Sequence, residues 1–175
     1  MKKLKLTELG RLSPEAYQQT LKVDLVVILD NIRSAMNVGS IFRTCDAMAI
    51  HSLLLCGITA IPPNREITKT AIGATDSVGW QYYKDTKEAI LQLKNDGYTV
   101  IAIEQTNESV ELMDFKPNNR KLAIVLGNEV NGVDQGILHL MDGAIEIKQY
   151  GTKHSLNVSV CGGIVIHHLS ELIRK

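Results

Sequence analysis

The sequence predicts an α/β protein with a mostly parallel sheet flanked by helices. Three observations predict this class. Apolar runs rich in Val, Ile and Leu recur along the chain, a composition typical of strands buried on both faces. Helical patterns lie between several of these runs, and such alternation favours a parallel sheet. The length of 175 residues, with 45% apolar and 22% charged residues, suits one globular domain that buries a core.

Residues 1–23 are expected to form an N-terminal helical appendage, set apart from a main domain over residues 24–175. Ser13 is suited to cap a short helix, because Pro14 follows it at the first helical position. The appendage is the most basic part of the chain. The residues expected to attach it through apolar contacts are Leu12, Tyr17 and Leu21.

The main domain is expected to begin with a buried strand over 24–30, an apolar and β-branched run bounded by acids. A loop then leads into a helix within 31–50, with Asn37 before the helix. A second strand follows over 52–57, and a loop carries Pro62 and Pro63.

The middle of the chain continues the alternation. Residues 80–84 predict a short edge strand, and Asp85 and Thr86 are suited to cap a helix that Gly97 ends. Three more strands are predicted over 98–104, 121–127 and 143–149, with a short helix over 134–141.

The segment 151–169 reads GTKHSLNVSVCGGIVIHHL, a polar loop that turns into a helix with an apolar face. Ser155 is suited to cap this helix. The free backbone N–H groups and the positive dipole end of its first turn then favour an anionic or carboxylate-bearing ligand. The alternative is an ordinary C-terminal helix that only packs on the body.

Composition limits the function classes. The formal net charge is zero, so nothing global indicates a nucleic-acid partner, although a neutral total is compatible with a local basic patch. No apolar stretch reaches the length of a membrane span, and the start MKKLK lacks the features of a signal peptide. We therefore expect a cytoplasmic protein with no membrane partner.

Cysteines and histidines do not indicate a metal site. Cys45, Cys56 and Cys161 are widely spaced and odd in number, which favours reduced, mostly buried thiols. The histidines lack a spacing that would pair them with carboxylates on one face. No G-x-G-x-x-G fingerprint of a dinucleotide site follows the first strand.

Three short motifs carry the strongest signal: NVGSIFR over 37–43, LGNEVNGV over 126–133 and SLNVSV over 155–160. In this order they resemble the three motifs of the SpoU or TrmH family of RNA ribose 2′-O-methyltransferases, in the SPOUT superfamily. The resemblance covers the chain from Asp24 onward. It implies a deep C-terminal trefoil knot, a homodimer with active sites formed across its two subunits, and S-adenosylmethionine as cofactor.

The resemblance assigns Arg43 to the ribose hydroxyl of the RNA. Without the motif, an arginine among such neighbours is typically a surface or ion-paired side chain. An arginine is also a poor base, because its pKa lies above about 12. We therefore expect Arg43 to grip phosphate and hydroxyl and to orient the nucleophile, with the proton acceptor left open. His154 is a candidate acceptor, and the alternative is a solvated loop histidine.

The other site residues are also assigned by resemblance. Asn37 belongs to the catalytic set, and Glu129 orders the active site at the dimer contact. Ser155 and Asn157 line the space between cofactor and target nucleotide. The residues expected to hold the cofactor are Glu104, Gly127, Ile147 and Leu156. Cys161 stands where the motif commonly has alanine, a swap of one small residue for another.

The target RNA is not specified by these motifs. The chain is close to a bare catalytic domain, and compact relatives often modify tRNA, so we expect guanosine methylation in tRNA. Ribosomal RNA is the alternative substrate, and a non-catalytic RNA-binding or assembly protein on the same fold is the rival class. A generic nucleotide-binding domain is a more distant alternative. The basic appendage is then either a solvated terminal helix or an arm that contacts RNA.

Overall fold

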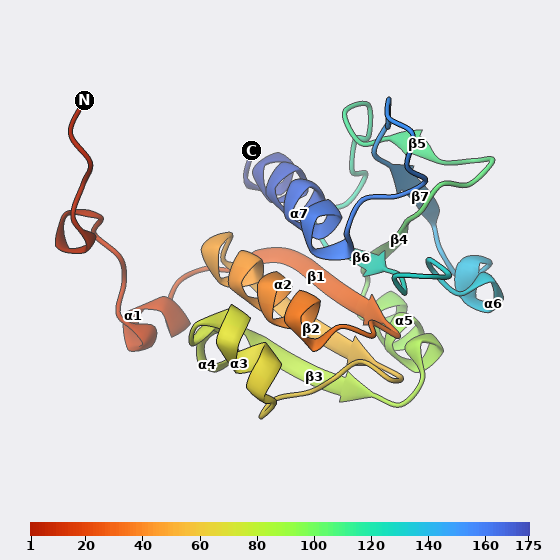
Figure 1. The fold of residues 1–175 in the computed structure, drawn as a ribbon. Coiled ribbons are helices and arrows are strands. Elements are labelled where there is room, and N and C mark those ends of the chain that lie inside the picture. The colour runs from red at the N-terminus through yellow and green to blue at the C-terminus, as the bar shows by residue number, and fades with distance from the viewer.

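The computed structural model describes the backbone of residues 1–175 and all side chains except those of Leu6 and Pro14. A seven-stranded sheet in the order β3-β2-β1-β6-β4-β7-β5 crosses the molecule (Figure 1), and all six pairs of neighbouring strands are parallel. The α/β prediction is therefore confirmed. The strands are β1 (Val23–Asp30), β2 (Ile50–Cys56), β3 (Gly79–Tyr83), β4 (Thr99–Ile103), β5 (Val110–Glu111), β6 (Leu122–Leu126) and β7 (Gly143–Glu146).

The central strands are buried on both faces, which explains their continuous apolar runs. In β1, Leu25 and Val27 face one apolar cluster, and Val26 and Ile28 face the other. The first cluster packs under α2 (Ala35–Ala47), α3 (Arg65–Ala71), α4 (Ala74–Ser77) and α7 (Val158–Arg174). The second packs under α5 (Thr86–Asn95) and α6 (Gln135–Leu138), so helices cover both faces (Figure 1).

Two predicted helix starts are wrong. Ser34 caps α2 by accepting a hydrogen bond from Asn37 N, so Asn37 lies inside the first turn and not before the helix. Ser155 does not cap α7. The cap is Asn157, whose side chain accepts from Ser159 N and Val160 N. Both Ser and Asn are good cap residues, so the sequence alone did not separate the two positions.

Three elements were not predicted. The helices α3 and α4 follow the predicted loop that carries Pro62 and Pro63, in a region for which no element was predicted. Their short sequences, REITKTA and ATDS, carry few apolar residues and so give little helical signal. The strand β5 has only two residues. Elsewhere the elements agree with prediction: β3 lies at an edge of the sheet, and Asp85 caps α5.

The N-terminal residues form a short 3-10 helix (Leu6–Glu8) and α1 (Pro14–Gln18), which Ser13 caps as predicted. Tyr17 attaches α1 to the body, because its hydroxyl donates to the backbone oxygen of Asp46 at 3.0 Å. The apolar contacts predicted for Leu12 and Leu21 are wrong, since these side chains are 56% and 97% exposed.

Two further structural observations bear on function. Within the residues described, no helix combines the length and the apolar character needed to cross a bilayer. Cys45 and Cys56 are buried, Cys161 is half-buried, and none of the three is in a disulfide. Burial raises the pKa of all three thiols, so they are protonated near neutral pH. The knot implied by the resemblance stays a prediction.

Candidate functional site

A cavity of about 800 Å³ opens beyond the carboxyl ends of β4, β6 and β7. Open parallel sheets bind their ligands at this edge, where the order of strands departs from the order of the chain. The volume lies within the range of small-molecule and cofactor sites. The cavity is walled by three loops, which follow these three strands. The residues assigned by resemblance that line it are Glu104, Gly127, Glu129, Ile147, Ser155, Leu156 and Asn157.

Glu129 is a hydrogen-bonded hub at the mouth of the cavity. Its Oε2 accepts from Arg33 N at 2.8 Å, and its Oε1 accepts from Ser34 N at 3.0 Å and from Asn37 Nδ2 at 2.9 Å. Partial burial raises the pKa of Glu129, but the hydrogen bonds from Arg33, Asn37 and Ser34 together lower it below its usual value. The carboxylate is therefore ionised and ties the β6 loop to the start of α2.

Asn37 extends this network to α7. Its Oδ1 accepts from Asn157 Nδ2 at 3.3 Å, while Asn157 Oδ1 accepts from Ser159 N at 2.9 Å and caps α7. Three residues from three separate motifs, Asn37, Glu129 and Asn157, thus meet in one hydrogen-bonded chain. Such a network fixes the side chains before any ligand arrives, as a preorganised site requires.

The turn after β6 requires glycine at two positions, for two different reasons. A Cβ on Gly127 would lie 2.1 Å from backbone atoms of Gly132 and Val133, so the chain passes itself too closely for any side chain. Gly132 has a φ of +68°, and a Cβ there would lie 2.1 Å from the carboxylate of Glu104. Only glycine fits both positions without strain.

Glu104 holds two loops of the cavity together. Its Oε2 accepts from Val133 N and its Oε1 from Gln105 N, each at 2.9 Å. Gln105 in turn donates from Nε2 to the backbone oxygen of His154 at 3.0 Å, which reaches the third loop. Sequence reasoning missed Gln105, because an amide with this role carries no local signal beyond its place directly after a strand.

The cavity is acidic. Its lining includes the carboxylates of Glu104, Glu129 and Glu146, and among the lining residues described there is no Lys or Arg. Apolar side chains such as Leu126, Ile145 and Ile147 supply the rest of the wall. This combination suits a ligand with a positive charge and an apolar or aromatic part.

Arg43 does not line the cavity. It is exposed and lies six residues after Asn37 on α2, about 9 Å along the helix axis at roughly 1.5 Å per residue. Among the side chains that the structure describes, its guanidinium has no hydrogen-bond or ion-pair partner. In the single chain Arg43 is thus an exposed surface residue without an ion pair among the described residues, and its role toward the ribose hydroxyl stays a prediction.

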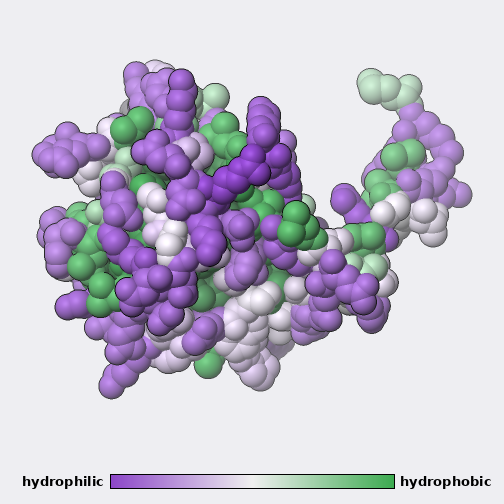
Figure 2. Space-filling model, turned by 180° about the vertical axis from the view of Figure 1, so that it is seen from behind, coloured by the Kyte–Doolittle hydropathy of each residue, from purple (hydrophilic) through white to green (hydrophobic). Residues whose placement is uncertain are grey.

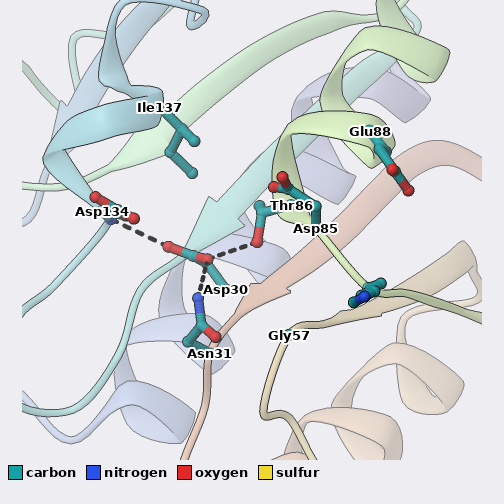
Figure 3. Close-up of a pocket in the computed structure, with 9 residues that line it drawn as sticks. Asp30, Asn31, Gly57, Asp85, Thr86, Glu88, Asp134 and Ile137 are labelled. Atoms are coloured by element: carbon teal, nitrogen blue, oxygen red, sulfur yellow. Dashed lines mark hydrogen bonds between the residues drawn. The ribbon is translucent and has the colours of Figure 1, made fainter.

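A second cavity of about 380 Å³ lies at the same edge of the sheet, near the amino ends of α5 and α6 (Figure 3). The carboxylate of Asp30, which is 1% exposed, accepts from Thr86 Oγ1 at 2.6 Å, Asn31 Nδ2 at 2.9 Å and Asp134 N at 3.1 Å. These bonds satisfy the buried carboxyl oxygens and join β1 to both helices. Across the described part of the chain, no group of three or more His, Cys, Asp or Glu is arranged to hold a metal.

The fold and the first cavity define an α/β protein whose cavity, at the carboxyl edge of a parallel sheet, is suited to a cationic, partly apolar ligand. Comparison with known proteins specifies the family. The chain belongs to the SpoU rRNA Methylase family, which it matches over residues 24–167. The resemblance predicted from the three motifs is therefore confirmed.

Individual relatives agree with this membership. A tRNA (guanosine(18)-2′-O)-methyltransferase of Thermus thermophilus is 32% identical over 91% of this chain and 81% of its own length. The 23S rRNA (guanosine-2′-O-)-methyltransferase of Neisseria meningitidis serogroup B is 31% identical over 86% of this chain and 58% of its own. The crystal structure of the Aquifex aeolicus TrmH/SpoU tRNA modifying enzyme superposes with a TM-score of 0.80 at 27% identity, over 91% of this chain and 80% of that one.

Proposed function

We propose that the protein transfers the methyl group of S-adenosylmethionine to a ribose 2′-hydroxyl of RNA, with a tRNA guanosine as the substrate. The observation that carries this proposal is the network of Asn37, Glu129 and Asn157 at the mouth of an acidic cavity, in a member of the SpoU family. Relatives at 32% and 31% identity act on guanosine in tRNA and in 23S rRNA. Both relatives methylate a guanosine 2′-oxygen, which supports the proposed reaction. This chain covers 81% of the tRNA enzyme and 58% of the rRNA enzyme, which favours tRNA as the substrate.

The cavity residues fit the cofactor. S-adenosylmethionine, when bound, supplies an electrophilic methyl group on a sulfonium. Its adenine needs an apolar slot, which Ile147 and Leu156 would form, with their backbone groups available for hydrogen bonds. Glu104 and Glu129 would favour its positive charge, and Gly127 would keep the turn beside the cofactor compact, because a side chain there would collide with the backbone of Gly132 and Val133. Ser155 and Asn157 also line the cavity, and in this proposal they would lie between the cofactor and the target ribose.

The proposal includes a homodimer, because Arg43 stands outside the cavity of its own chain. The outer faces of α2 and α7, which pack side by side, leave apolar side chains unburied. Their exposed fractions are 46% for Met36, 52% for Val160 and 43% for Ile164. A two-fold contact through these faces would bury them and bring Arg43 of one copy to the cavity of the other.

In that composite site Arg43 would bind the phosphate and the ribose hydroxyl of the target nucleotide with its planar fork. Its protonated guanidinium orients the nucleophile and does not remove its proton. The proposal includes RNA as the partner and the cytoplasm as the location of the reaction.

Two measurements test the proposal. Calorimetric titration should show binding of S-adenosylmethionine and S-adenosylhomocysteine, and absence of binding at millimolar cofactor would leave a non-catalytic RNA-binding protein. Nucleoside analysis of purified tRNA and rRNA from a strain that lacks the gene should show loss of 2′-O-methylguanosine from tRNA. Loss from rRNA alone would assign the ribosomal substrate instead.

A further inference from the structure

The neutral total charge hides a separation of charge between two parts of the molecule. Residues 1–22 contain five Lys and Arg and two Asp and Glu, a net charge of +3. The remaining residues, 23–175, contain fourteen Lys and Arg and seventeen Asp and Glu, a net charge of −3. A body of this sign gives no net attraction for a polyanion, so a cationic element set apart from the body is a candidate contact for RNA.

The positive charge lies on an arm that extends away from the body. Figures 1 and 2 show residues 1–12 projecting beyond the sheet and helices. Every side chain described in this arm is exposed, and its described side-chain hydrogen bonds, such as that from Lys2 to Glu8, stay within the arm. Lys3, Lys5 and Arg11 have no side-chain partner among the described residues, so their charges are available to a ligand.

The root of the arm is attached beside Arg43. Tyr17 donates to the backbone oxygen of Asp46, which lies one helical turn after Arg43 on α2. The ammonium of Lys22 lies over the Tyr17 ring, 3.0 Å from its centre, and this cation–π contact holds the Tyr17 side chain in place. The arm is thus anchored to the helix that carries the proposed RNA-gripping residue.

We propose that residues 1–12 form an RNA-binding arm, in which Lys3, Lys5 and Arg11 bind backbone phosphates of the substrate RNA outside the methylated nucleotide. This inference rests on the proposed function. The arm supplies sequence-independent affinity and Arg43 positions the target, a division of labour typical of nucleic-acid enzymes. If the arm bound a protein and not RNA, the contact would use its exposed leucines. Leu4 and Leu12 are each 56% exposed.

The test compares two triple variants of the full chain. The arm variant is Lys3→Gln, Lys5→Gln, Arg11→Gln. The control variant, Lys87→Gln, Lys116→Gln, Arg120→Gln, removes the same charges from exposed positions of the body that also have no side-chain partner among those described. Affinity for bulk tRNA is measured as a function of KCl concentration, together with cofactor affinity, methyl transfer and molecular mass.

The arm variant should bind tRNA roughly tenfold or more weakly at low salt, and the slope of log K against log salt should fall by about two, since each phosphate contact contributes about 0.7 to 0.9. KM for tRNA should rise by the same factor, with kcat and cofactor affinity unchanged. The control should stay within about twofold of wild type, a margin of roughly 0.4 kcal/mol.

Three results would overturn the inference. The first is equal tRNA affinity and salt slope in the arm and control variants, while wild type binds tRNA and cofactor. The second is a fall in mass of the arm variant alone to 19.3 kDa from a larger wild type, which would make the arm a contact between copies. The third is a wild type that binds cofactor but not tRNA. A wild type that binds neither ligand would refute the proposed function itself.

Discussion

Glu129→Gln tests the hub of the site with the smallest change of shape. The carboxylate accepts three hydrogen bonds, one on Oε2 from Arg33 N and two on Oε1 from Ser34 N and Asn37 Nδ2. A glutamine of the same size offers one accepting oxygen. If that oxygen keeps the two bonds of Oε1, its NH₂ group faces the N–H of Arg33, donor against donor.

The expected loss of stability follows from the one hydrogen bond that glutamine cannot accept. One hydrogen bond to a charged group contributes roughly 1.5 to 3 kcal/mol when buried. Glu129 is exposed, so water satisfies much of the lost bond and about 1 kcal/mol remains. Asn37 also holds Asn157, so we expect slower methyl transfer together with this loss of stability.

The effect should depend on pH. The pKa of Glu129 is lowered in the folded state from its ordinary value of 4.5, so its contribution to the free energy of unfolding is full above about pH 5. As the pH falls through the lowered folded pKa, the carboxylate takes up a proton and the contribution is lost. The free energies of unfolding of wild type and Glu129→Gln should therefore differ most near pH 7 and become similar in acid.

The assay is urea unfolding at fixed protein concentration at pH 7 and pH 3.5, with methyl transfer measured in parallel. Glu88→Gln is the control, an exposed glutamate on α5 whose side chain has no hydrogen-bond partner among the residues described. If the free energy of unfolding of Glu129→Gln at pH 7 differs from that of wild type by less than about 0.5 kcal/mol, the level of an ordinary surface substitution, the reasoning is refuted.

Three further predictions concern the composite site. Arg43→Lys should lose on the order of 10²-fold in single-turnover methyl transfer, because lysine lacks the planar fork, and unchanged turnover would remove the assignment. Gly127→Ala should abolish cofactor binding in calorimetry, since its Cβ would meet backbone at 2.1 Å, whereas Gly143→Ala makes an ordinary 3.6 Å contact and should bind normally. Ile164→Glu should halve the mass measured by light scattering, and Leu91→Glu, at the same 43% exposure, should not. A monomeric wild type would contradict the dimer.

Local sequence determined the parts of the structure that depend on near neighbours. The apolar runs of β1, β4 and β6 predicted strands buried on both faces. The helix α5 was predicted with Asp85 and Thr86 as cap candidates, and Asp85 is the cap. The glycines of the β6 turn were also predictable, because positive φ and close approach leave glycine as the residue that fits. These features follow from periodicity and backbone sterics within a few residues.

Local sequence was weaker where the free energy of an element comes from its surroundings. The polar helix α3 forms because Ile67 and Ala71 are buried against α2, a contact that its own seven residues do not announce. The start of α7 is fixed at Asn157 and not at Ser155, and Asn157 is the residue that also hydrogen-bonds Asn37.

Only the tertiary structure decided how the site is assembled. Asn37 and Glu129 lie 92 residues apart and Asn37 and Asn157 lie 120 apart, yet parallel strands bring their following loops to one edge of the sheet. The same packing holds Arg43 outside the cavity of its own chain and sets the basic arm apart from an acidic body. The sequence determines which residues are present and in what order. The distances between residues far apart in the sequence are set only when the chain folds, because burial of both apolar faces of the sheet favours one order of strands.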